Sequence, residues 1–100
     1  MKEYKFIENP AVFAIFCKRN EEYDIIYIGE TTGERKQLLT EHEEYRCWME
    51  KCNQELKNLY LAIFEAPSEI YSFSDRKEIK EELINQLNPS CSLSESNNLQ

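Results

Sequence analysis

The side chains of this chain that are best suited to chemistry are four cysteines and a single histidine. Cys17, Cys47, Cys52 and Cys91 could form two disulfides, or they could bind a metal together with His42. The spacing favours neither arrangement. Cys47 and Cys52 are separated by about 140° around the axis of an expected helix and so share no ligating face. We therefore expect reduced thiols that pack as small hydrophobic side chains, with no metal and no other cofactor.

The composition is that of one soluble domain. The chain has 100 residues, of which 41% are hydrophobic and 31% are charged, and a chain of this length has room for one core. Residues 1–5 lack the apolar run of a secretory signal, and no apolar stretch reaches the roughly 18 residues needed to span a bilayer. We expect a cytoplasmic protein without membrane contact, with one domain over residues 1–92 and a flexible tail over residues 93–100.

The negative charge is concentrated in one part of the chain. The net charge is -7, and residues 21–50 carry nine acidic side chains against three basic ones. Proteins that bind nucleic acids usually present clustered lysines and arginines to the phosphates. This distribution argues against nucleic acid as the main partner and is compatible with a protein partner.

Two strands joined by a short connection are expected near the start. Ala11–Cys17 is apolar and rich in β-forming residues, and Tyr23–Gly29 alternates along its length. The polar residues 18–22 connect them, which predicts an antiparallel hairpin. In the register that we assume, Phe16 and Tyr27 lie near each other on one face of the sheet.

The rest of the chain predicts three helices and one more strand. Apolar residues recur at helical spacing in two segments, a short β-prone run follows, and Asp75 with Glu78 has the spacing of a capping box. The fold class is therefore α/β (α+β), with a small three-stranded antiparallel sheet flanked by helices. The expected elements are helices over Glu34–His42 and Glu43–Lys57, a buried strand over Leu59–Phe64, and a helix that begins at Ser74-Asp75 and stops at Asn88-Pro89.

The predicted hairpin carries a recognisable pair of short sequences. Ala14-Ile15-Phe16 is followed, after ten residues, by Tyr27-Ile28-Gly29. This pair resembles the signature of the GIY-YIG nucleases, with phenylalanine in place of the first tyrosine. The resemblance covers about residues 11–92 and implies a GIY-YIG-like fold.

The end of the last helix extends the resemblance. Leu83-Ile84 and Pro89 match the family's ending in one register. In that register Lys80 stands where the family has its metal-binding glutamate, and Ser92 stands where it has an asparagine. A helical wheel places Lys80 inside the apolar stripe of the helix. The other members of that stripe are Ile79, Leu83, Ile84 and Leu87, and the acidic residues predicted to face solvent are Glu78, Glu81 and Glu82.

The resemblance also implies what these replacements remove. In the family, two tyrosines and an arginine position and activate a water, and a carboxylate holds a divalent metal. Lys80 offers only donors and would repel that metal, and Phe16 lacks the hydroxyl used for proton handling. The family's arginine position is Gln37 here, with Arg35 as a candidate substitute. The complete vestigial site consists of Phe16, Tyr27, Arg35, Gln37, His42, Lys80 and Ser92.

The replacements predict a pseudoenzyme, a catalytically inactive GIY-YIG-like domain that acts as a protein-binding or regulatory module. A first alternative is a diverged metal-dependent endonuclease that uses Tyr27, Arg35 and His42, with Glu30 or Glu65 holding Mg²⁺ or Mn²⁺. A second alternative is an acidic mimic of DNA that inhibits a nucleic-acid enzyme.

Overall fold

The three strands form one antiparallel sheet, as the sequence predicts. The computed structural model describes residues 9–32 and 39–91. Within them, β1 (Ala11–Arg19), β2 (Glu22–Thr31) and β3 (Leu59–Glu65) are arranged in the order β2-β1-β3. The expected fold class, a small three-stranded antiparallel sheet flanked by helices, is confirmed.

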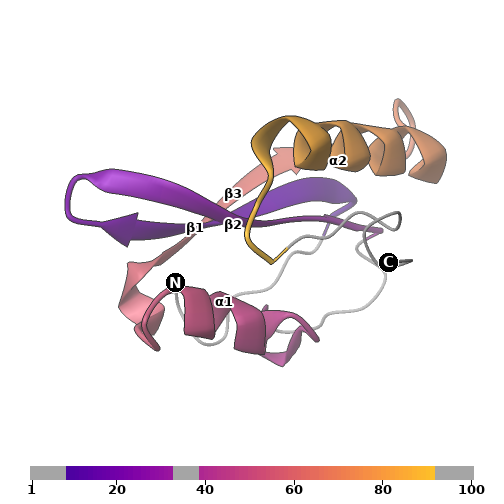
Figure 1. The fold of residues 1–100 in the computed structure, drawn as a ribbon. Helices are drawn as coiled ribbons and strands as arrows, with labels where there is room; N and C mark the ends of the chain where they lie inside the picture. The colour runs from indigo at the N-terminus through magenta and orange to yellow at the C-terminus, as the bar shows by residue number, and fades with distance from the viewer. Residues whose placement is uncertain (1–8, 33–38, 92–100) are drawn as a thin grey trace.

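The two α-helices cover opposite faces of this sheet (Figure 1). Helix α1 (Tyr45–Lys51) lies on one side and helix α2 (Phe73–Leu87) on the other. Because neighbouring residues of a strand point to opposite faces, β1 supplies both layers. Phe13, Ile15 and Cys17 pack on the α1 side, whereas Val12 packs with Ile28 and Ile84 on the α2 side.

Helix α1 is shorter than predicted. The apolar spacing predicts a helix over Glu43–Lys57, but α1 ends at Lys51 and a 3₁₀ turn, Leu56–Asn58, precedes β3. Asn53 and Gln54 between them have φ values of 54° and 61°. Such left-handed residues cannot continue a right-handed helix. Of the predicted helix Glu34–His42, only its last part is described, as a 3₁₀ turn over Leu39–Glu41.

Strand β3 is at the edge of the sheet, and most of it is exposed. Only Leu59 is fully buried, so the prediction of a buried strand is wrong. The apolar run reads like a core strand, but β3 has a neighbour on one side only and α2 packs over β2 and β1. The position in the sheet therefore decides its exposure.

Helix α2 begins with a capping box, although not the predicted one. The Ser72 side chain accepts from the backbone N–H of Asp75 at 3.0 Å, and the Asp75 carboxylate accepts from the N–H of Ser72 at 2.9 Å. Asp75 is thus the inner member of the box and not its first residue. At the other end, Asn88 adopts the left-handed conformation and stops the helix as expected. Leu87, predicted to belong to the apolar stripe, is 49% exposed.

All four cysteines form disulfides, so the expectation of reduced thiols is wrong. Cys17 is bonded to Cys52 and Cys47 to Cys91, with Cα atoms 5.7 Å and 6.0 Å apart. The wide angle predicted between Cys47 and Cys52 argues only against the binding of one metal ion by both, and it does not argue against disulfides. It also lets α1 and the turn after it reach two different partners, β1 on one side and the segment after α2 on the other.

Candidate functional site

Five rings form a cluster between the sheet and α1, and this aromatic cluster contains two of the predicted site residues. It consists of Phe13, Tyr27, His42, Tyr45 and Trp48. The His42 ring stacks on Trp48 with centroids 4.9 Å apart, and it meets Tyr27 edge-on at 5.2 Å. Tyr27 lies 5.2 Å from Trp48 and 5.8 Å from Phe13. The structure thus brings Tyr27 and His42 together, from β2 and from the segment before α1.

Gly29 explains part of the signature by packing alone. A Cβ atom at this position would lie 2.6 Å from Cζ of Phe13 and 2.6 Å from Cε2 of Tyr27. Real Cβ atoms do not approach other atoms so closely. The glycine after Tyr27-Ile28 is therefore required because two rings of the aromatic cluster fill the space above it.

The histidine of the cluster is held in its neutral form. The backbone N–H of Glu44 donates to Nδ1 of His42 at 2.9 Å, so the proton of the neutral ring resides on Nε2. Burial lowers the pKa of His42 below its usual value, against an opposing effect of the Glu43 carboxylate.

Tyr27 and Trp48 of the cluster are also unsuited to proton release. Burial, with help from the carboxylates of Glu44 and Glu43, raises the pKa of Tyr27 to about 12. The phenol therefore keeps its proton at neutral pH. Nε1 of Trp48 is buried and has no hydrogen-bond acceptor among the described residues.

Phe16 does not share the face of Tyr27, which corrects the assumed register. In the hairpin Tyr27 is opposite Ile15, and Phe16 is opposite Ile25, with an irregularity between Ile15 and Phe16 that accommodates Ile26 as an extra residue. Ile25 packs on the α2 side, whereas Tyr27 packs on the α1 side. The ring that faces Tyr27 from β1 is Phe13.

The remaining vestigial residues are distributed as follows. Lys80 is half-buried on α2 and thus belongs to the same side of the sheet as Phe16, across from Tyr27 and His42. Arg35, Gln37 and Ser92 lie outside the described residues. The described residues that are predicted to form a vestigial site are therefore split between the two faces of the sheet.

Glu30, one of the carboxylates considered for a metal, is already paired with a buried cation. Nε of Arg76 donates to Oε2 of Glu30 at 3.2 Å, and Arg76 is only 2% exposed. Nη1 of Arg76 donates to the carbonyl oxygens of Tyr71 at 3.0 Å and Ala66 at 3.2 Å. This guanidinium joins β2, the segment after β3 and α2 at one point.

Sequence reasoning missed Arg76, although the helical wheel contains the signal. Relative to Ile79 at zero, Arg76 falls at about 60°, close to the centre of the apolar stripe. An arginine at that angle is expected either to extend its head group to solvent or to find a buried carboxylate. Here it finds Glu30, whereas the predicted stripe member Leu87 is exposed.

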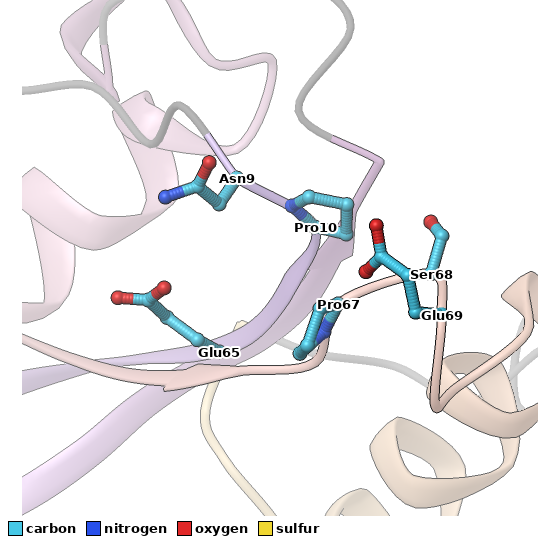
Figure 2. Close-up of a pocket in the computed structure, with 6 residues that line it drawn as sticks. All are labelled: Asn9, Pro10, Glu65, Pro67, Ser68 and Glu69. Carbon is cyan, nitrogen blue, oxygen red and sulfur yellow. The ribbon is translucent and has the colours of Figure 1, made fainter.

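Glu65, the second carboxylate considered for a metal, lines a surface pocket of about 320 Å³. Glu65 and Glu69 lie on either side of Pro67 in this pocket (Figure 2). Within residues 9–32 and 39–91, no group of three or more histidine, cysteine, aspartate or glutamate side chains could hold a metal ion. The lining residues are Asn9, Pro10, Glu65, Pro67, Ser68 and Glu69.

Two further findings bear on function. No known protein family, curated protein or solved structure matches the chain. None of the helices in the described part of the chain combines the length and apolar character needed to cross a membrane.

Proposed function

We propose that this chain is a non-catalytic binding domain of GIY-YIG-like topology that recognises another protein. The observation that supports this proposal most is the division of the vestigial residues. Tyr27 and His42 lie on the α1 side of the sheet, and Phe16 and Lys80 on the α2 side. Groups on opposite faces cannot act on one phosphate.

The chemistry of the individual groups supports the same proposal. Tyr27 keeps its proton, with a pKa of about 12, and Nδ1 of His42 is occupied by the N–H of Glu44. The carboxylate of Glu30 is neutralised by Arg76. These residues stabilise the fold, so function is assigned to the surface and not to this cluster.

The surface that we assign to the partner is the exposed aromatic area beside the β1–β2 turn, on the α2 side of the sheet. The hairpin extends past α2 at this end (Figure 1). Tyr23 and Tyr60 meet edge-on there, with centroids 5.4 Å apart, and Nζ of Lys18 lies 5.8 Å from the centre of the Tyr23 ring. Exposed tyrosines are typical of protein interfaces because the ring buries apolar area and the hydroxyl forms hydrogen bonds.

Two observations that point to different cellular compartments bear on where the domain would meet its partner. The sequence predicts a cytoplasmic location, whereas two disulfides are typical of proteins that work in oxidising compartments. Trapping free thiols with an alkylating reagent in intact cells, followed by mass spectrometry of the four cysteines, would decide between these locations.

The binding proposal is tested by comparing three variants in affinity capture with chemical crosslinking. Tyr23→Ser and Tyr60→Ser each remove one ring of the proposed surface. Phe73→Ser removes a similarly exposed aromatic side chain at the N-terminal end of α2, which is the end farther from the β1–β2 turn (Figure 1), and is the matched control. A protein that binds wild type and Phe73→Ser but not the two tyrosine variants supports the proposal.

The nuclease alternative makes the opposite prediction. Incubation with plasmid and branched DNA in Mg²⁺ or Mn²⁺ would produce cleavage that Tyr27→Phe abolishes, and a resident metal would raise the melting temperature. Cleavage of this kind would show that the domain is catalytic and would overturn the proposal, whereas a raised melting temperature alone would show only that a metal binds. The DNA-mimic alternative predicts binding to a basic nucleic-acid enzyme that weakens steeply with salt and is insensitive to Tyr60→Ser.

A further inference from the structure

The outer edge of β3 offers a row of backbone groups to a neighbour. The N–H of Ala66 donates to the carbonyl of Pro10 at 2.9 Å, and Ala66 faces Pro10 one step beyond the pair Ala11 and Glu65. Because hydrogen-bonded pairs alternate in an antiparallel ladder, Ala62 and the residues two positions away from it bond to β1. Leu61 and Ile63 therefore direct their N–H and C=O groups outward, and within the described residues β3 has β1 as its sole neighbour in the sheet.

The two edges of the sheet differ in ways that matter for pairing. From Tyr60 to Phe64 the β3 edge carries no charge, and Tyr60, Ile63 and Phe64 are 42%, 42% and 49% exposed. The β2 edge carries acidic residues, and the N–H of Cys91 already donates to the carbonyl of Ile26 there at 2.7 Å. Charges and covering segments protect an edge from pairing, so only the β3 edge is suited to accept another strand.

We propose that the β3 edge binds the β3 edge of a second copy of this chain, antiparallel, with a two-fold axis beside Ala62. In this register Ala62 faces Ala62 of the other copy, Leu61 faces Ile63, and Tyr60 faces Phe64. The outward groups of Leu61 and Ile63 then meet in hydrogen-bonded pairs, giving about four bonds across the axis. The same arrangement places aromatic opposite aromatic on one face and aliphatic opposite aliphatic on the other.

This pairing produces a closed dimer with a continuous six-stranded sheet. Each copy uses its one suitable edge, and the β2 edges at the two ends do not pair, so the assembly stops at two copies. The net charge of -7 on each chain opposes association. Salt screens this repulsion, so the dimer is expected to become stronger as ionic strength rises.

The register is tested by cysteine crosslinking. Opposite residues of a non-hydrogen-bonded pair have Cα atoms about 4.5 Å apart, within the range of a disulfide. Ala62→Cys should therefore give a covalent dimer with oxidised glutathione on a non-reducing gel. In the matched control Phe64→Cys the two new thiols are four strand residues apart, about 13 Å, and should stay unlinked. Equal crosslinking of both variants, or of neither, would overturn the proposal.

The edge itself is tested without cysteine by analytical ultracentrifugation. Wild type and Ile63→Val should shift from monomer to dimer over about a hundredfold range of concentration. Ile63→Pro removes one outward N–H but no bond to β1, and it should remain monomeric with an unchanged circular dichroism spectrum. A wild type that is monomeric throughout, or an Ile63→Pro dimer as strong as wild type, excludes edge pairing. Tyr60 belongs to both proposed surfaces, whereas Tyr23 belongs only to the partner surface. Tyr23→Ser therefore separates the two proposals, because it should weaken partner binding and still dimerise.

Discussion

At the scale of single residues, the signature Tyr27-Ile28-Gly29 is explained by packing. Tyr27 belongs to the aromatic cluster, Ile28 packs on the α2 side, and Gly29 leaves the space that the rings of Phe13 and Tyr27 occupy. These three residues can therefore persist in a chain without catalysis. The sequence predicts well that these residues lie on a strand, because side-chain alternation and the lack of a Cβ atom in glycine are local properties of the chain. It does not reveal that the ring packed against Tyr27 from β1 is Phe13, since one extra residue in the hairpin changes the face of every residue beyond it.

The histidine of the cluster predicts a pH dependence of stability. Burial lowers the folded-state pKa of His42 below its unfolded value of about 6.5, so the unfolded chain binds the proton more readily. The free energy of unfolding contributed by this group is therefore complete above pH 6.5 and decreases as the pH falls through about 6.5 toward the folded-state pKa. Protonation also removes the Nδ1 lone pair that accepts from Glu44.

The measurement is the urea midpoint of wild type and His42→Gln between about pH 5 and 7.5. Glutamine retains an acceptor for the Glu44 N–H but does not titrate, so the variant should lose less stability on acidification than wild type. Because the chain contains one histidine, its ring protons can also be followed directly by NMR. Parallel pH profiles for the two proteins, or a pKa of His42 above 6.5, would contradict this assignment.

At the scale of elements, Arg76 holds three segments together and predicts a large difference between two arginine substitutions. Arg76→Met leaves the Glu30 carboxylate and two carbonyl groups without their donor in a buried place. The free energy of unfolding should fall by about 3 kcal/mol or more. In the control Arg46→Met, the lost pair with Glu50 is exposed and the change should stay within about 1 kcal/mol. Chemical denaturation measures both, and similar losses would show that the buried pair has no special role.

The elements also show where sequence reasoning is strong and where it fails. The hairpin, the third strand and the last helix are predicted close to their observed bounds because their patterns are local. The predicted length of α1 is too great because Asn53 and Gln54 adopt left-handed conformations. The periodicity of apolar side chains does not encode those conformations. The prediction that β3 is buried is wrong because an apolar run does not indicate whether its strand is central or at an edge of the sheet. That exposure is the feature on which the dimer proposal depends.

At the scale of the whole molecule, two disulfides connect α1 and the turn after it to the rest of the fold. Cys17–Cys52 ties the turn after α1 to β1, and Cys47–Cys91 ties α1 to the segment that follows α2. Helix α1 has seven residues, which is too short to be stable alone. Pairing of distant cysteines depends on the completed fold, so spacing along the chain could not predict it.

The disulfides predict a strong and ordered response to reduction. The bonded residues are 35 and 44 positions apart in the sequence, and loops of that length correspond to about 3–4 kcal/mol of stability for each bond. Cys17 and Cys52 are both 1% exposed, whereas Cys47 is half-buried, so a thiol reagent should open Cys47–Cys91 first.

The double variant Cys47→Ser, Cys91→Ser should therefore lower the urea midpoint yet keep Trp48 in an apolar environment. Full reduction should release α1 and shift the fluorescence of this single tryptophan to longer wavelength. If reduced protein with four titratable thiols kept the midpoint and emission of the oxidised form, the aromatic cluster alone would be sufficient to hold α1 on the sheet.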